Sequence, residues 1–147
     1  MHAAALSAHA RRMKRHGLVL ALLFGSLLNL HANLGDGPEL SAGKYGRSYG
    51  AAPADIIPRM TNLGDTFTSA TYHFDGYTIC CVFHLNFTCI AILYKKESGG
   101  ILDAEANQLI VNNGTKEGVN VMKRTKSSIL LGTDKYEQLM EASVQGL

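Results

Sequence analysis

The stretch TSATYHFDGYTICCVFHLNFTCIAILYKK, residues 68–96, decides the fold, and it holds all three cysteines of the chain. Asp75-Gly76 separates two segments rich in β-branched and aromatic residues, a setting typical of a tight β-hairpin turn. Apolar and polar residues then alternate over residues 83–89, as they do in a strand with two different faces. Near residues 84–86 the strand either bends or turns. The stretch therefore predicts antiparallel strands at the centre of a sheet.

The same stretch has a competing interpretation as a membrane span. Residues 77–94 carry no charge and are followed by Lys95-Lys96, a flank typical of a transmembrane segment. Together with the apolar run near the N-terminus, this span would make a two-span membrane hairpin. His84 and Asn86, at the centre of this span, are polar, and apolar and polar residues around them alternate with a period of two. Both observations favour the sheet over a membrane helix.

The rest of the chain extends the sheet on its C-terminal side. Residues 118–131 contain two strand-like pieces, and residues 101–111 fit either a helix or the start of a strand. Asp134, with Glu137 three residues later, indicates an N-cap and a short C-terminal helix. Residues 66–147 are thus predicted to form a small β-rich domain. The predicted fold class is α+β, mostly antiparallel β-sheet with a short C-terminal helix.

Two further regions precede this domain. Residues 33–65 are predicted to be a Gly/Pro-rich linker or a loop-rich lead-in, because glycine and proline interrupt them too often for a long regular element. Residues 1–32 predict a signal peptide or an N-terminal anchor, since basic residues at 11–16 precede an apolar run at 17–28. That run is short for a bilayer span, which needs about 20 residues. A mitochondrial presequence and a buried core segment are the alternatives.

The charge distribution argues against nucleic-acid binding. Four of the 14 basic residues lie in residues 11–15, and no acidic residue precedes Asp36. The chain from Asp36 onward therefore has ten basic against 12 acidic residues, a net charge of −2. Phosphate binding needs clustered lysine and arginine, so we expect no nucleic-acid partner.

The cysteines and two glycosylation sequons bear on the compartment. In an oxidising compartment, Cys89 is a candidate disulfide partner of either Cys80 or Cys81; in a reducing one, all three read as small buried residues. Asn86 and Asn113 each begin an Asn-X-Thr sequon and are the candidate glycosylation sites. The sequons agree with the N-terminal signal in favouring secretion.

No pattern in the sequence is typical of a catalytic or metal site. There is no Cys-X-X-Cys, no His-Glu-X-X-His and no Gly-X-Ser-X-Gly, and nothing sets the geometry of His73 and His84 beside the cysteines. We therefore expect no cofactor, no metal site and no catalytic residue, and we favour a binding protein over an enzyme.

One family resemblance offers a different cellular setting. The succession Thr71-Tyr72, Tyr77, residues 80–83 and residues 87–92 resembles the central antiparallel hairpin of longin-type domains, which are vesicle-trafficking modules. The resemblance implies a cytosolic or membrane-associated interaction domain with reduced cysteines, in which residues 17–28 are a core strand.

The leading functional hypothesis is a non-catalytic secreted or lumenal glycoprotein module that binds a protein partner through a Tyr-rich sheet edge or loops. The longin-like trafficking domain is the alternative, with a cytoplasmic or vesicle-associated location. The two-span membrane hairpin is the third hypothesis. A mitochondrial location follows from the presequence interpretation, and membrane association through the N-terminal segment is compatible with several of these hypotheses.

Overall fold

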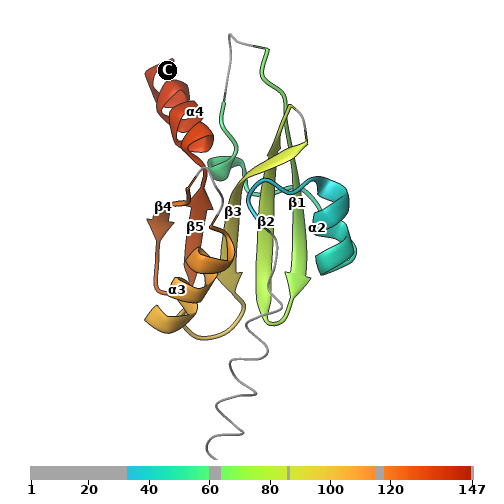
Figure 1. Cartoon of the computed structure of the whole chain (residues 1–147), viewed down its shortest axis with the longest axis vertical. Helices are drawn as coiled ribbons and strands as arrows, with labels where there is room; N and C mark the ends of the chain where they lie inside the picture. The colour runs from blue at the N-terminus through green and yellow to red at the C-terminus, as the bar shows by residue number, and fades with distance from the viewer. Residues whose placement is uncertain (1–32, 60–63, 86, 115–117, 147) are drawn as a thin grey trace, which may run out of the picture. The chain divides into compact units, whose positions relative to one another are not determined.

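A five-stranded antiparallel sheet is the centre of the fold (Figure 1). The computed structural model describes residues 33–59, 64–85, 87–114 and 118–146, which belong to one unit, His31–Leu147. The strands are β1 (Phe67–Phe74), β2 (Tyr77–His84), β3 (Thr88–Lys96), β4 (Asn120–Arg124) and β5 (Ser128–Gly132), in the spatial order β1-β2-β3-β5-β4. The predicted α+β class is confirmed. The predicted signal peptide or anchor at residues 1–32 and the Asn86 sequon lie outside the described residues.

Both predicted turning points are present in the stretch that decides the fold. Asp75 and Gly76 have φ angles of 50° and 78°, which a two-residue hairpin turn with positive φ at both central positions requires. At the next turning point, His84 pairs with Thr88, and Phe87 has a φ of 56°. The chain therefore turns there rather than bending. Residues 77–94 form β2 and most of β3, and no helix within the described part of the chain is long and apolar enough to span a membrane.

Four helical segments accompany the sheet: α2 (Pro38–Tyr45), the 3-10 turn η1 (Ala54–Ile56), α3 (Asp103–Asn112) and α4 (Asp134–Gln145). The predicted C-terminal helix is α4, but its N-cap is Thr133 rather than Asp134: the Thr133 hydroxyl accepts a hydrogen bond from the backbone N–H of Tyr136. The ambiguous residues 101–111 form most of α3. Within residues 33–65, Tyr45 of α2 and Ile56 of η1 are buried, so this region contributes side chains to the core.

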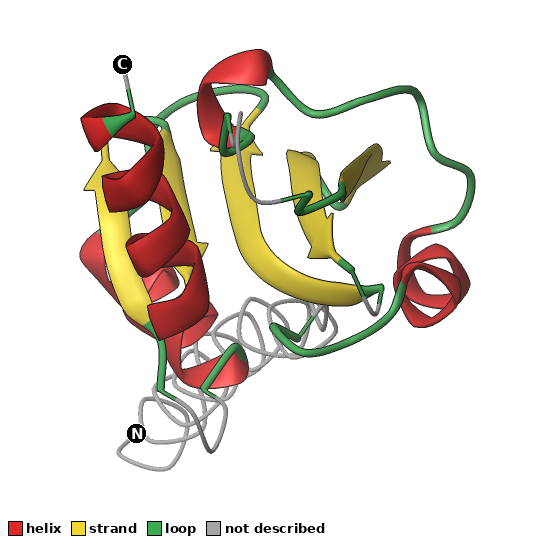
Figure 2. Ribbon diagram, turned by 90° about the horizontal axis from the view of Figure 1, so that it is seen from above, coloured by secondary structure: helices red, strands yellow, loops and turns green. Residues whose placement is uncertain are grey.

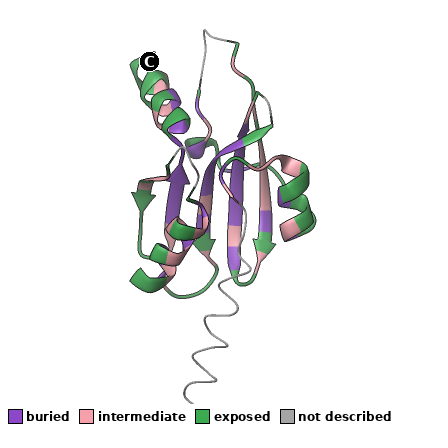
Figure 3. Cartoon of the chain, viewed as in Figure 1, coloured by how far each residue is buried: buried purple, intermediate pink, exposed green. Residues whose placement is uncertain are grey.

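Buried residues run through the central strands of the sheet (Figure 3), and the most deeply buried side chains lie on one face, called here the closed face. Side chains from four strands on this face are at most 2 % exposed: Tyr72, Ile79, Cys81, Ile92 and Leu131. The ring of Tyr45 in α2 packs against Tyr72, with 5.5 Å between ring centroids. On the α3 side, Asn113 donates a hydrogen bond to the Tyr94 hydroxyl.

The opposite face, called here the second face, is covered over only part of its length. α4 packs against β3, β4 and β5 (Figure 2), and its Tyr136 ring lies over Gly132. The Tyr136 hydroxyl donates to the Ile56 carbonyl at 2.7 Å, which ties α4 to η1. The apolar cluster beneath these elements includes Ile56, Val82, Ala91, Leu130, Tyr136 and Leu139. Beyond this cluster, the second face changes to polar side chains.

Candidate binding site on the second face

Strand register brings four polar residues into one row across the uncovered part of the second face. His73 of β1 pairs with Thr78 of β2, Thr78 pairs with Lys95 of β3, and Lys95 pairs with Ser128 of β5. Paired residues in antiparallel strands point to the same face, so these four side chains form a single row. We call it the polar row.

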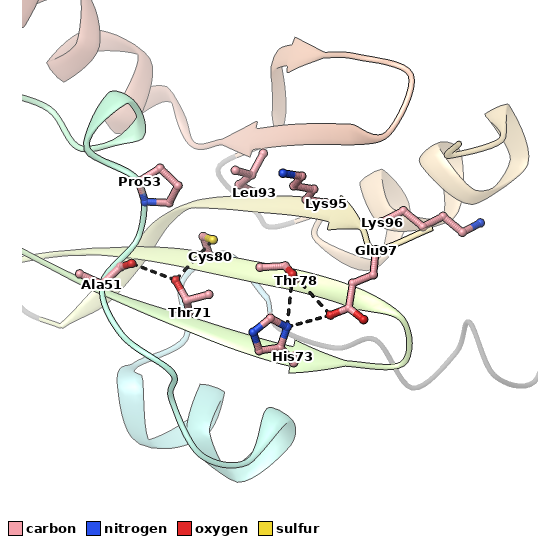
Figure 4. A pocket seen from close by; sticks show the side chains of 10 residues that line it. All are labelled: Ala51, Pro53, Thr71, His73, Thr78, Cys80, Leu93, Lys95, Lys96 and Glu97. Atoms are coloured by element: carbon pink, nitrogen blue, oxygen red, sulfur yellow. Dashed lines mark hydrogen bonds and ion pairs between the residues drawn. The ribbon is translucent and has the colours of Figure 1, made fainter. Parts of the chain in front are cut away.

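A depression of about 580 Å³ lies along this row, over β1, β2 and β3 (Figure 4). Residues on the next row, Thr71, Cys80 and Leu93, also line it, and Ala51 and Pro53 line it from the segment that precedes β1. We call this site the polar depression. Its lining is mixed: the polar row supplies His73, Thr78 and Lys95, and apolar groups come from Cys80, Leu93, Ala51 and Pro53.

His73 and Glu97 form the fixed part of the site. The Nδ1 atom of His73 lies 2.7 Å from Oε1 of Glu97, and both side chains are about half exposed. The Thr78 hydroxyl lies 3.3 Å from the same nitrogen. The ring of Tyr49 meets the His73 ring edge-on, at 4.9 Å between centroids. The imidazole is therefore held by contacts with three neighbouring side chains.

The two lysines that border the depression differ in their partners. Lys96 ends 2.7 Å from Glu105 of α3, and Figure 4 shows it pointing away from His73. Lys95 is exposed on the second face, and no carboxylate of the described residues lies within ion-pair distance of it. The depression therefore has one cation, Lys95, that no described carboxylate neutralises.

The thiol in the depression is not activated. Burial raises the pKa of Cys80 above its ordinary value, although the Thr71 hydroxyl, 3.5 Å from Sγ, opposes that shift. A nucleophilic cysteine needs a lowered pKa or an adjacent base. Cys80 has a raised pKa, and no hydrogen bond links its sulfur to His73 within the described part of the chain.

The His73 contacts also do not make a catalytic relay. In such a relay one ring nitrogen is oriented by a carboxylate while the other removes the nucleophile's proton. Here Glu97 and Thr78 both lie at Nδ1, so the threonine is not placed at the second nitrogen. No group of three metal-ligating side chains is present among the residues described. The arrangement can donate and accept hydrogen bonds, and it can hold charge, which are properties of a binding site.

Among the described residues no disulfide lies at bonding distance, which matches the second of the two alternatives for the cysteines, small buried residues. All three cysteines are free and buried. Cys80 faces the depression, whereas Cys81 lies on the closed face with Cys89 beside it, and the thiol of Cys89 donates to the Ala91 carbonyl. Burial, followed by the contact with Cys81, raises the pKa of Cys89 well above its ordinary value. Cys80 and Cys89 are therefore neutral thiols in the folded domain.

The candidate glycosylation site Asn113 lies in the core. Its side chain is fully buried and donates to the Tyr94 hydroxyl at 3.0 Å and to the Leu109 carbonyl at 2.8 Å. A glycan on this nitrogen would require the side chain to leave the core. The Asn-Gly pair suggested an exposed turn, but Asn113 is the C-cap of α3 with its amide directed inward.

The Tyr-rich sheet edge is also not exposed. Of the six tyrosines, only Tyr49 is exposed, at 69 %, and the others are buried in the core. The polar depression was not identified from the sequence. The alternate polar positions Ser69, Thr71 and His73 on β1 are the signal that would have indicated it.

Comparison with known proteins gives no assignment: the chain matches no protein-family model, no curated protein and no solved structure.

Proposed function

We propose that this domain is a non-catalytic protein-binding module and that its partner docks in the polar depression. The observation that carries the proposal is the change along the second face from a covered apolar cluster to an uncovered polar row. A concave site in which a few polar groups stand beside apolar ones is typical of a binding site, and the depression has this mixed lining. His73 and Glu97 are already held in place, so binding would cost little of their side-chain entropy.

A blocking substitution tests this proposal. Peptides selected from a displayed random library on the wild-type domain are expected to bind Thr78→Tyr about tenfold more weakly, because the ring fills the depression. Val121→Tyr, on an exposed position of β4, is the matched control and is expected to change affinity less than about twofold. Affinity is measured by calorimetry on variants with unchanged melting temperatures. The proposal is contradicted if the selected peptides bind both variants with equal affinity, or if no selected peptide loses affinity on Thr78→Tyr.

We also propose a secreted or lumenal location for the module. The support is the basic then apolar order of residues 11–28. Of the two predicted glycan acceptors, Asn86 is the one that this proposal retains. A cytosolic interaction domain is the second candidate, and the three free buried thiols favour it, because thiols persist in reducing compartments.

Mass spectrometry of the full chain expressed in mammalian cells separates these two locations. After alkylation in denaturant without reductant, the secretory proposal expects a chain that lacks about the first 32 residues, and the fold predicts alkylation of all three thiols. A cytosolic chain that retains residues 1–32 would contradict the secretory location and leave the binding proposal intact. Fewer than three alkylated thiols would show that a disulfide forms in that compartment.

A further inference from the structure

We infer that the segment which docks on the second face is acidic and is held by Lys95 and Lys123; this inference rests on the proposed function. The first step concerns which charges near the depression are already paired. Glu97 has His73 at 2.7 Å, and Lys96 has Glu105 at 2.7 Å. Of the charged residues that line the depression, Lys95 is the one that forms no ion pair with any described residue.

A second unpaired cation lies on the same face. Leu93 pairs with Leu130 of β5, and Leu130 pairs with Lys123 of β4, so Lys123 and Lys95 point to the same side of the sheet. Lys123 is exposed and, like Lys95, forms no ion pair with any described residue. The second face therefore presents, one on each side of β5, two ammonium groups that have no ion-pair partner among the described residues.

The spacing of these two lysines fits an extended peptide. They lie two strands apart and, because Lys95 pairs with Ser128 whereas Lys123 pairs with Leu130, they are also offset by two residues along the strands, which together corresponds to about 12 Å. In an extended chain, residues three or four positions apart are separated by about 10–13 Å. A segment with two carboxylates three or four positions apart would therefore reach both lysines, whose long side chains allow some freedom.

One hydroxyl group adds a donor beside Lys95. Ser128 pairs with Lys95 in the same row, and its hydroxyl contacts that of Thr125 at 2.7 Å, in which either oxygen can be the donor. The hydroxyl of Thr78, on the other side of Lys95, already donates to Glu97. Two lysines are too few for the phosphate backbone of a nucleic acid, which needs clustered lysine and arginine. An acidic protein segment is the occupant that this surface complements.

Labelled synthetic peptides test the inference directly. Fluorescence anisotropy compares peptides of about eight residues in which serine alternates with glutamate, glutamine or lysine. The Ser/Glu peptide is expected to bind best, and Lys95→Gln and Lys123→Gln are each expected to weaken it about three- to fivefold. Lys135→Gln removes the same charge from an exposed position of α4 and is expected to have an effect below about twofold. Affinity for the wild type is expected to fall with added salt.

The outcomes separate this inference from the proposed function. Equal binding of the Ser/Gln peptide, or tighter binding of the Ser/Lys peptide, overturns the acidic partner, while sensitivity to Thr78→Tyr would still support the depression as the docking site. An equal loss on Lys135→Gln also overturns the assignment to the two lysines. Displacement of the Ser/Glu peptide by an equal concentration of oligothymidine would identify a phosphate polymer instead. If no peptide binds and library selection also yields none, the proposed function itself fails.

Discussion

Replacement of Tyr136 by alanine is expected to lower the free energy of unfolding by about 3–5 kcal/mol, the usual cost of truncating a large buried aromatic residue. Tyr136 is fully buried, and its ring lies where a Cβ on Gly132 would come within 2.6 Å. Its hydroxyl donates to the Ile56 carbonyl at 2.7 Å. The side chain therefore joins α4, β5 and η1, and its loss would open a cavity among all three.

Urea unfolding followed by circular dichroism measures this loss. Tyr136→Phe keeps the ring but leaves the buried Ile56 carbonyl without its donor, and is expected to cost about 1–2 kcal/mol. Burial raises the pKa of Tyr136 to about 12, so the hydroxyl remains a donor throughout the ordinary pH range. Tyr49→Ala is the control at an exposed tyrosine, with an expected change within about 0.5 kcal/mol. A loss below about 1 kcal/mol for Tyr136→Ala would contradict the packing described here.

Local sequence chemistry predicted the strands and turns well. The Asp75-Gly76 turn was predictable because few residue pairs adopt positive φ at two successive positions without strain. The apolar stripe of α4 was predictable because Tyr136 and Leu139 recur at helical spacing beside polar residues. Both features depend on short-range pattern, which a single sequence displays directly.

Features that depend on tertiary contacts were not predictable in the same way. The Asn113-Gly114 pair has the composition of an exposed turn, yet the partner of Asn113 is Tyr94, in a different strand. The polar depression depends on the register between three strands. It also requires that α4, which packs on β3, β4 and β5, leaves His73 and Lys95 uncovered. Alternation shows that a strand has a polar face, but it does not show whether another element covers that face.

Glu105 is the residue whose charge contributes most clearly to folding. Its carboxylate accepts hydrogen bonds from the Lys96 ammonium at 2.7 Å, the Leu102 backbone N–H at 2.8 Å and the Tyr77 hydroxyl at 3.2 Å. Burial alone would raise the pKa of Glu105, but the hydrogen bonds, first that from Lys96, together lower it below its ordinary 4.5. The carboxylate thus joins the start of α3 to β2 and β3.

Glu105→Ala is accordingly expected to cost about 1.5–3 kcal/mol at neutral pH, the range for hydrogen bonds to a charged group. Because the folded-state pKa is lowered, this stabilisation is present above the unfolded-state pKa and is lost as pH falls through the folded-state pKa. Glu105→Gln, which is neutral at every pH, separates charge from shape. The difference in unfolding free energy between wild type and Glu105→Gln should therefore shrink between about pH 7 and about pH 3.

Urea unfolding at a series of pH values provides this measurement, with Asp103→Asn as the matched control. Asp103 lies in the same first turn of α3 and pairs with Arg124 at 2.6 Å, but its side chain is 89 % exposed. Exposed ion pairs contribute little because water screens them, so Asp103→Asn should leave both the stability and its pH dependence nearly unchanged. A difference between wild type and Glu105→Gln that stays constant at acidic pH would show that the carboxylate acts through its shape, because a stabilising charge must disappear when Glu105 is protonated.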